Sequence, residues 1–143
     1  MTLFSIFITI TLTINGMIDP EVGNLIVEIP EIKEQKGKII ILIFSSEDGF
    51  PNNFEKAVAK IGFDNYSASI THTFEQLPFG AYALVIAQDR NNNGKIDRGK
   101  IIPKPKEPIG MSNLIELTPP SFKHSMFHFN EDGMKITVPF MNQ

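Results

Sequence analysis

The chain has 143 residues, of which 42% are hydrophobic and 20% charged, and its formal net charge is -3. This length and composition predict one globular domain and exclude a disordered chain. The absence of cysteine excludes disulfides, thiolate metal sites and a lipid-modified N-terminal cysteine, and the scattered Lys and Arg form no basic stripe for nucleic acid.

The first segment, Leu3 to Ile14, is apolar and carries no charge. Its length suits the apolar region of a signal peptide and is too short to span a bilayer. We therefore predict a signal peptide over residues 1–18, cleaved near Gly16, and export to the periplasm, the cell surface or the medium. No Lys or Arg precedes the segment and no Ala-x-Ala site follows it, so a first strand of alternating Thr and Ile stays open.

Residues 19–143 predict a single domain made mainly of strands. Asn24 to Ile29 alternates between apolar and other residues, as a half-buried strand does. Lys38 to Phe44 is apolar on both faces, which is typical of a central strand. Apolar residues then recur at helical spacing between Phe54 and Ile61, just after Pro51, and predict one short helix.

The second half of the chain also predicts mainly strands. Ser67 to Phe74 alternates as a strand, and the turn at Leu77 to Gly80 leads into another strand at Ala81 to Gln88. The proline-rich residues 98–113 predict an extended, irregular segment.

Two closing strands, Phe122 to Phe129 and Met134 to Phe140, are predicted to form a hairpin through Asp132-Gly133. About seven strands and one short helix predict an all-β fold, a two-sheet antiparallel sandwich, with a small barrel as the alternative.

The stretch from Asp89 to Asp97 is the one segment whose pattern predicts chemistry. Oxygen-bearing side chains stand at positions one, three, five and nine, and Gly94 at position six permits a sharp reversal. This is the spacing of a calcium-binding loop, in which Ile96 would anchor the loop to the core. The predicted ligands are the side chains of Asp89, Asn91, Asn93 and Asp97 and the backbone carbonyl of Lys95.

The match to a calcium loop is incomplete. Position twelve is Lys100 and not a bidentate Glu, and few of the ligands are charged. Weak binding is therefore expected, on the order of 10⁻⁴–10⁻³ M, which would fill the site only outside the cytoplasm. The alternative needs no metal, because Asn93-Gly94 favours a tight hairpin in which Asp and Asn side chains cap their own backbone.

Phe74 to Asp97 also resembles the signature of a family of exported bacterial proteins, domain-of-unknown-function family 2141. Its pattern runs L-P-x-G-x-Y-A, then a strand, then H-D-x-N-x-N-G-K-x-D, followed by P-x-E and G-x-S-N. The chain matches it at Leu77-Pro78-Phe79-Gly80-Ala81-Tyr82-Ala83, Asp89 to Asp97, Pro105-Lys106-Glu107 and Gly110-Met111-Ser112-Asn113. It departs from the pattern at Gln88, where the family has histidine, and it lacks the glycine usual before P-x-E. The resemblance implies a secreted or periplasmic sandwich of the immunoglobulin or prealbumin type, with no activity.

Two matched residues carry physical hypotheses of their own. The hydroxyl of Tyr82 is placed to bond back to the backbone as a tyrosine corner. Glu107 is a lone acid in the proline-rich segment, and we expect it to fold over the Asp89–Asp97 loop. There it would supply the missing acidic metal ligand, or pair with Lys95 or Arg98; the alternative is a solvated surface carboxylate.

The chain contains neither a Gly-x-Ser-x-Gly elbow nor a His-Glu-x-x-His motif, so we predict no enzyme. We expect a non-catalytic module of the cell envelope that calcium stabilises. It would not be an integral membrane protein, and its partner would be another envelope protein or a glycan. The second hypothesis is a carbohydrate- or peptide-binding module, although residues 89–113 contain no aromatic side chain on which a sugar could stack. The third is a hydrolase.

Overall fold

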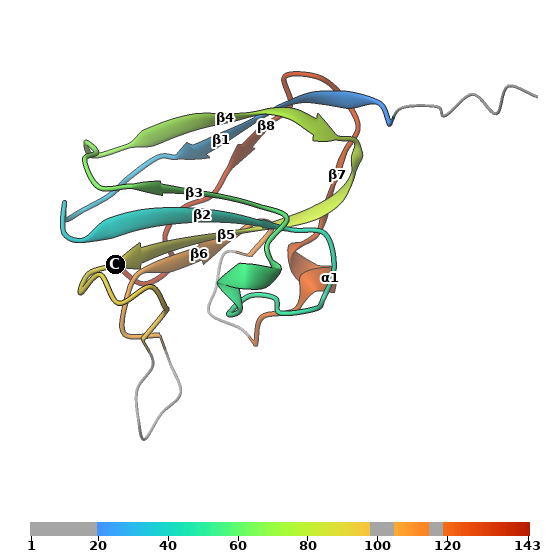
Figure 1. Cartoon of the computed structure of the whole chain (residues 1–143). Coiled ribbons are helices and arrows are strands. Elements are labelled where there is room, and N and C mark those ends of the chain that lie inside the picture. Colours follow the sequence, from blue (N-terminus) through green and yellow to red (C-terminus); the bar gives the residue numbers. More distant parts are fainter. Residues whose placement is uncertain (1–19, 98–104, 115–118) are drawn as a thin grey trace, which may run out of the picture.

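The computed structural model describes residues 20–97, 105–114 and 119–143 (Figure 1). Its eight strands are, in chain order, β1 (Val22–Ile29), β2 (Lys38–Phe44), β3 (Ala59–Phe63), β4 (Ile70–Pro78), β5 (Gly80–Asp89), β6 (Ile109–Met111), β7 (Phe127–Phe129) and β8 (Lys135–Thr137). Two short helical turns lie in the connections, η1 (Phe54–Lys56) and α1 (Phe122–Ser125). The predicted signal peptide lies outside the described residues.

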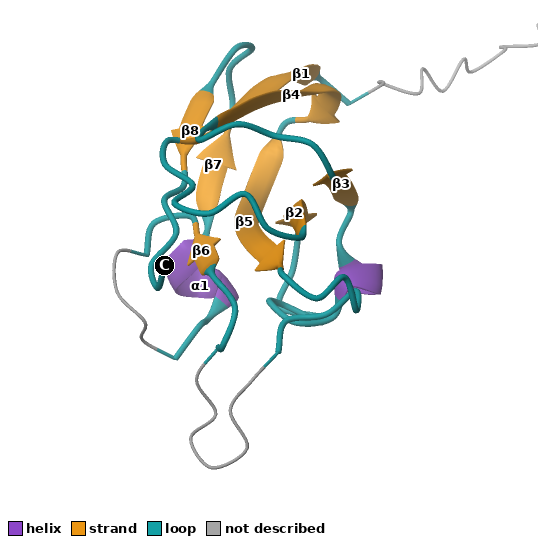
Figure 2. Ribbon diagram, turned by 90° about the vertical axis from the view of Figure 1, so that its left-hand side faces the viewer, coloured by secondary structure: helices purple, strands orange, loops and turns teal. Residues whose placement is uncertain are grey.

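The strands form two stacked sheets, and the predicted two-sheet sandwich is confirmed (Figures 1 and 2). The smaller sheet has the order β4-β1-β8, and the larger has the order β3-β2-β5-β6, with β7 also paired to β5. Every pairing is antiparallel except that of β8, which runs parallel to β1. In the described part of the chain, no helix is both long enough and apolar enough to cross a membrane.

The main core lies between the sheets and follows from strand alternation. Alternate residues of β1 point inward and are fully buried, as are their counterparts on β2 and β5: Leu25, Val27, Ile29, Ile39, Ile41, Ile43, Leu84 and Ile86. The intervening residues of β2 and β5, such as Leu42 and Val85, are buried in a second cluster on the outer face of the larger sheet. η1 and α1 cover this face, which explains why β2 is apolar on both sides.

The predicted closing hairpin at Asp132-Gly133 is wrong. β7 pairs with β5 and β8 pairs with β1, so the two strands belong to different sheets. Gly133 still makes a turn with φ +79°, and the Asp132 carboxylate accepts a hydrogen bond from the Asn24 amide at 2.7 Å. Asp132-Gly133 therefore forms the expected turn, but the turn connects β7 of the larger sheet to β8 of the smaller sheet.

The stretch predicted as a short helix contains only the three-residue 3₁₀ turn η1. Val58 is exposed, and the residues from Ala59 onward form edge strand β3. The irregular segment predicted over residues 98–113 contains the buried three-residue strand β6. In these two places long-range pairing, with β2 and with β5, overrides the local pattern.

Tyr82 bonds back to the turn that precedes β5, as predicted for a tyrosine corner. Its hydroxyl donates to the Pro78 carbonyl at 2.7 Å, and burial raises the pKa of the phenol. At its other end, β5 delivers Asp89 opposite Lys38 of β2. Gly37, with φ +72°, lies against the Asp89 carbonyl where any Cβ would collide. The start of the candidate loop is thereby fixed to the centre of the larger sheet.

Candidate functional site

The Asp89–Asp97 loop is wrapped around the carboxylate of its first residue. Asp89 is only 3% exposed, and its Oδ1 and Oδ2 accept hydrogen bonds from the amides of Asn93 (3.0 Å) and Gly94 (2.7 Å). Gly94 takes the left-handed conformation, φ +77°, with nothing within 4 Å of a Cβ built on it. A side chain at this position would meet strain in the backbone but no steric obstacle.

The three remaining side chains of the predicted set come together at the outer side of the loop. Asn91 Nδ2 donates to Asp97 Oδ2 at 2.6 Å, and Asn93 Nδ2 donates to Asp97 Oδ1 at 2.9 Å. The bond from Asn93, followed by that from Asn91 and the nearby charges of Lys95 and Lys106, lowers the pKa of Asp97. Both amide groups thus occupy the place where a cation would meet this carboxylate.

The side-chain oxygens of the two asparagines face the backbone of the loop. Asn91 Oδ1 accepts from the Asn93 amide at 3.2 Å, and Asn93 Oδ1 accepts from the Lys95 amide at 3.1 Å. These are Asx-turn contacts, which the hairpin alternative predicts and which also hold oxygens on one side of the chain. Ile96 packs against the second hydrophobic cluster, as predicted for the loop's anchor.

Glu107 joins the two ends of the loop. It is 5% exposed; its Oε1 accepts from the Arg90 amide at 2.8 Å and its Oε2 accepts from the Asp97 amide at 3.1 Å. The Lys106 amide donates to the Asp97 carbonyl at 2.8 Å, which brings the P-x-E segment alongside the loop. The alternative of a solvated surface carboxylate is therefore wrong for Glu107.

The two most buried carboxylates at the loop, those of Asp89 and Glu107, form no ion pair with any Lys or Arg that the structure describes. The guanidinium of Arg90 instead reaches Glu34 at 3.4 Å. Within the described ranges, no three His, Cys, Asp or Glu side chains are grouped to hold a metal. Any cation here would consequently depend on the oxygens of Asn91 and Asn93 as well.

Gln88, where the family pattern has histidine, points away from the loop. Its side chain is fully buried on the opposite face of β5 from Asp89, and its Nε2 lies within hydrogen-bonding distance of the carbonyls of Glu34 (2.6 Å) and Lys36 (3.0 Å) and of the hydroxyl of Tyr66 (3.2 Å). A side chain at this position therefore ties the β1–β2 connection to the sheet and does not reach the loop.

The G-x-S-N residues also serve the fold. Ser112 Oγ accepts from the Leu84 amide at 2.9 Å and donates to the Ser125 carbonyl at 2.6 Å, both in the buried interior. Asn113, with φ +58°, donates from Nδ2 to the Met126 carbonyl at 2.6 Å. These two residues hold the α1–β7 segment onto β5.

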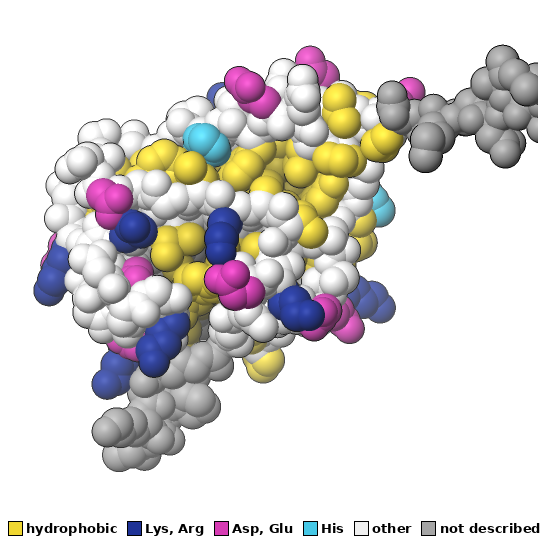
Figure 3. Space-filling model, in the orientation of Figure 1, with side chains coloured by type: hydrophobic (Ala, Val, Ile, Leu, Met, Phe, Trp, Pro, Cys, Tyr) yellow, Lys and Arg dark blue, Asp and Glu magenta, His cyan; other side chains and the backbone are white. Residues whose placement is uncertain are grey.

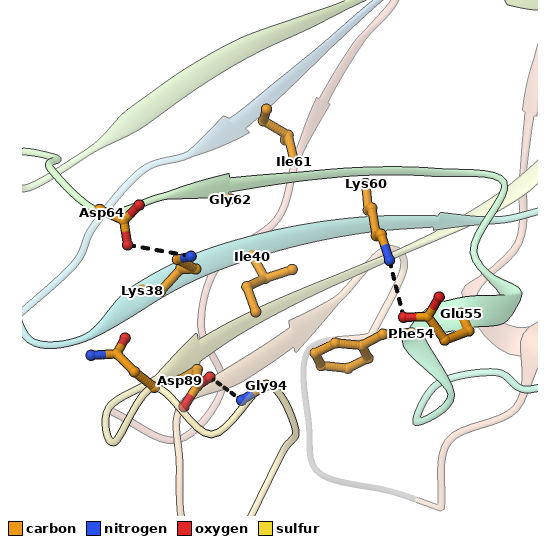
Figure 4. Close-up of a pocket in the computed structure, with 11 residues that line it drawn as sticks. Lys38, Ile40, Phe54, Glu55, Lys60, Ile61, Gly62, Asp64, Asp89 and Gly94 are labelled. Atoms are coloured by element: carbon orange, nitrogen blue, oxygen red, sulfur yellow. Dashed lines mark hydrogen bonds and ion pairs between the residues drawn. The ribbon is translucent and has the colours of Figure 1, made fainter.

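A groove of about 580 Å³ lies on the outer face of the larger sheet, with the loop as one wall (Figure 4). Half-buried Ile40 lies between two ion pairs, Lys38–Asp64 at 3.4 Å and Lys60–Glu55 at 3.1 Å. The ring of Phe54, from η1, projects toward the loop below Ile40. The complete lining is Lys38, Ile40, Phe54, Glu55, Lys60, Ile61, Gly62, Asp64, Asp89, Asn92 and Gly94.

The sequence alone does not predict this groove, because its walls come from four separate segments. Phe54 reads as a core residue of a helix, and Lys38 and Lys60 read as ordinary surface charges. The one available signal was the alternation in Lys60-Ile61-Gly62, which places a charge and a glycine on a single strand face.

The comparisons with known proteins identify one family. The sequence model of DUF2141, described as an uncharacterized protein conserved in bacteria, matches residues 27–137. Searches of curated proteins and of solved structures returned no match. The matched range spans β2 to β8 completely and the last three residues of β1, together with the loop and Glu107.

Proposed function

The chain belongs to the DUF2141 family of bacterial proteins, and we propose that it is a non-catalytic β-sandwich module, exported to the cell envelope and stabilised by calcium at its Asp89–Asp97 loop. Supporting export is the uncharged apolar stretch from Leu3 to Ile14, which has the length of a signal-peptide core. The matched motif residues Tyr82 and Ser112 are occupied with hydrogen bonds inside the fold, which supports a structural role over a catalytic one.

The observation that carries the calcium proposal is the pair of buried carboxylates. Asp89 and Glu107 are 3% and 5% exposed, and neither has a described cationic partner. Buried charges in proteins are usually paired with an opposite charge or coordinate a metal. Backbone amides partly compensate for these two, and a divalent cation at the loop would supply the positive charge that the described residues do not.

The predicted ligands suit a hard cation in kind. Carboxylate, side-chain amide and backbone carbonyl oxygens are the donors that calcium prefers. Asp89, Asn91, Asn93 and Asp97 with the Lys95 carbonyl would hold the ion, and Glu107 would support the loop ends or provide a further oxygen. With mostly neutral ligands, a dissociation constant on the order of 10⁻⁴–10⁻³ M is expected, within the range of extracellular modules.

The direct test is thermal unfolding of the purified protein in chelator, in millimolar calcium and in millimolar magnesium. A metal that binds only the folded state raises the midpoint once its concentration exceeds the dissociation constant. Calcium at ten times the dissociation constant should add about 1.4 kcal/mol to the free energy of unfolding. An unchanged midpoint up to tens of millimolar calcium would leave Asp89–Asp97 as a hairpin that needs no metal.

The effect of calcium on the stability of Asn93→Asp distinguishes a calcium site from a hairpin that needs no metal. In chelator the new carboxylate faces Asp97, in place of an amide that donates at 2.9 Å, so repulsion should lower stability. In calcium the same change adds an anionic ligand and should tighten binding. Destabilisation that calcium reverses supports the site, whereas equal destabilisation in both buffers contradicts it. Asn130→Asp, at an exposed position distant in sequence from the loop, serves as the matched control.

Export can be tested separately from calcium binding. Mass spectrometry of the protein recovered from the envelope or the medium should show a mature N-terminus close to Gly16. A protein that keeps Met1 and stays in the cytoplasm would contradict both export and calcium filling of so weak a site.

A carbohydrate- or peptide-binding module is the second candidate, because the fold places Phe54 beside a loop whose own sequence has no aromatic residue. The groove combines an apolar centre with charged ends, and its volume lies within the usual range for ligand sites. Titration with neutral cell-wall oligosaccharides and with short peptides, followed by NMR, should perturb amides of β2, β3 and η1. Loss of those shifts in Phe54→Ala would locate the ligand, and no shifts at millimolar ligand would refute this candidate.

A further inference from the structure

Strand β3 is the least protected sheet edge in the described part of the molecule. It closes the larger sheet on one side, and its five residues pair with β2 in an unbroken register from Ala59 to Phe63. It contains no proline and no bulge. Natural proteins usually protect such an edge, because its free N–H and C=O groups are a template for another strand.

The other described edges carry the protection that β3 lacks. The edge of β6 is covered by the C-terminal segment: the Met141 amide donates to the Ile109 carbonyl at 2.8 Å, and Gly110 lies directly against the Pro139 carbonyl. β4 is interrupted by an irregularity where Gln76 takes φ +52°. β7 and β8 have only three residues each. On β3, Lys60 is the only comparable protective feature.

The rim beside β3 is also apolar. Ala59, Ile61 and Phe63 point toward the core but remain half-buried, because no further strand follows them. Val58, just before the strand, is 55% exposed. Figure 3 faces this side of the molecule and shows hydrophobic side chains in a band between β3 and β4. A strand added to β3 would cover the lower part of this band.

We propose that β3 pairs with β3 of a second copy of this chain, antiparallel and two-fold symmetric about Ile61. The strand is self-complementary in this register. On the inner face, the small Ala59 lies opposite the partner's large Phe63, and on the outer face the long Lys60 lies opposite the partner's Gly62. Large residues therefore meet small ones on both faces, as an isologous interface requires.

Charge supports this register as well. Lys60 has no like charge directly opposite it, and the partner's Asp64 lies one step along the same face. Asp64 is 72% exposed, so its ion pair with Lys38 leaves most of the carboxylate accessible. A symmetric register centred on Lys60 would place two ammonium groups opposite each other, and one shifted by a single residue would turn Ile61 to solvent.

The pairing would also join two grooves. Lys60, Gly62 and Asp64 line the groove at its β3 side, so the outer faces of two paired sheets would form one surface across the symmetry axis. This inference does not depend on calcium at the loop, since no residue of β3 belongs to the predicted metal set. Experiments in chelator therefore test the two proposals separately.

Sedimentation of the purified protein in chelator tests the dimer, from about 10 µM to about 1 mM, because a short edge pairing buries less than a standard interface. The native protein should pass from monomer to dimer within this range. A protein that stays monomeric at the highest concentration refutes the proposal, and so do assemblies larger than a dimer.

Two substitutions of opposite charge at Gly62 test whether β3 is the strand that pairs. Gly62 is exposed, and a Cβ there meets first the flexible side chain of Lys38 at 3.2 Å, so Gly62→Lys and Gly62→Glu should both fold. In the dimer each new side chain faces the partner's Lys60, twice by symmetry. Gly62→Lys should weaken dimerisation about fivefold and Gly62→Glu should strengthen it about fivefold. Equal shifts in both variants, or none in either, would place any dimer contact elsewhere. If Gly62→Lys fails to fold, the native protein and Gly62→Glu still decide the result.

Discussion

Replacing Glu107 by Gln tests whether this buried carboxylate joins the ends of the Asp89–Asp97 loop. In the native structure its two oxygens accept the amides of Arg90 and Asp97 at 2.8 and 3.1 Å, and the side chain is 5% exposed. Gln keeps the shape but offers one oxygen and one NH₂ group. One backbone amide therefore loses its acceptor and faces a second donor.

The magnitude follows from these two contacts. A hydrogen bond to a charged group contributes about 1.5–3 kcal/mol, and a buried donor left unpaired costs about 1–3 kcal/mol. Losing one such bond and weakening the other should lower the free energy of unfolding by about 3 kcal/mol in Glu107→Gln. That is a large part of the stability of a small domain, and it falls on a loop far from the main core.

Urea denaturation in chelator measures this loss by linear extrapolation. Glu131→Gln is the matched control, because Glu131 is exposed and its carboxylate makes no contact that the structure describes; a change within about 0.5 kcal/mol is expected there. Hydrogen exchange at the amides of Arg90 and Asp97 should accelerate selectively in Glu107→Gln. A loss below about 1 kcal/mol, or one equal to the control, would refute the assigned role of Glu107.

Further predictions concern single groups. Because the pKa of Asp97 is lowered by folding, its stabilising contribution should be complete above about pH 5 and lost as pH falls through about 4 and below; Asp97→Asn should flatten this acid limb in urea melts. The pKa of Tyr82 is raised, so stability should fall as pH rises above about 10, and Tyr82→Phe should remove that alkaline loss while costing about 1 kcal/mol at pH 7. Gly94→Ala should cost about 1–2 kcal/mol, since only the left-handed backbone opposes it. Gly37→Ala should cost clearly more in the same thermal melts, because its Cβ also meets the Asp89 carbonyl.

The strands that sequence analysis located well are those whose pattern is local. Lys38 to Phe44 was predicted with the bounds of β2, and β5 extends one residue beyond its prediction at each end. Their continuous or alternating apolar residues reflect burial on one or both faces, which a short window detects. The elements that were missed have a different cause: β6 has three residues, and only pairing with β5 and the cover of the C-terminal segment make it a strand.

The same distinction holds for the site. The oxygen spacing from Asp89 to Asp97 is local, so the sequence shows which side chains can meet, and the structure brings Asn91, Asn93 and Asp97 together. What the pattern could not reveal is what each group does there. Glu107 binds the backbone of two residues ten or more positions away, and the groove draws on separate segments. Such arrangements depend on topology and leave no periodic signal.

The hydrogen bonds inside the fold limit which residues are free to contact a ligand. Three residues of the family motifs form hydrogen bonds with backbone groups of this chain: Tyr82, Glu107 and Ser112. A ligand that contacted these atoms would have to displace bonds that hold the loop, the turn and β5 in place. The charged side chains of the outer groove, Lys38, Asp64, Lys60 and Glu55, face no such constraint, since their two ion pairs are exposed and cost little to separate. Substitutions of these four charged side chains should therefore alter binding of the proposed peptide or glycan while leaving the unfolding free energy nearly unchanged.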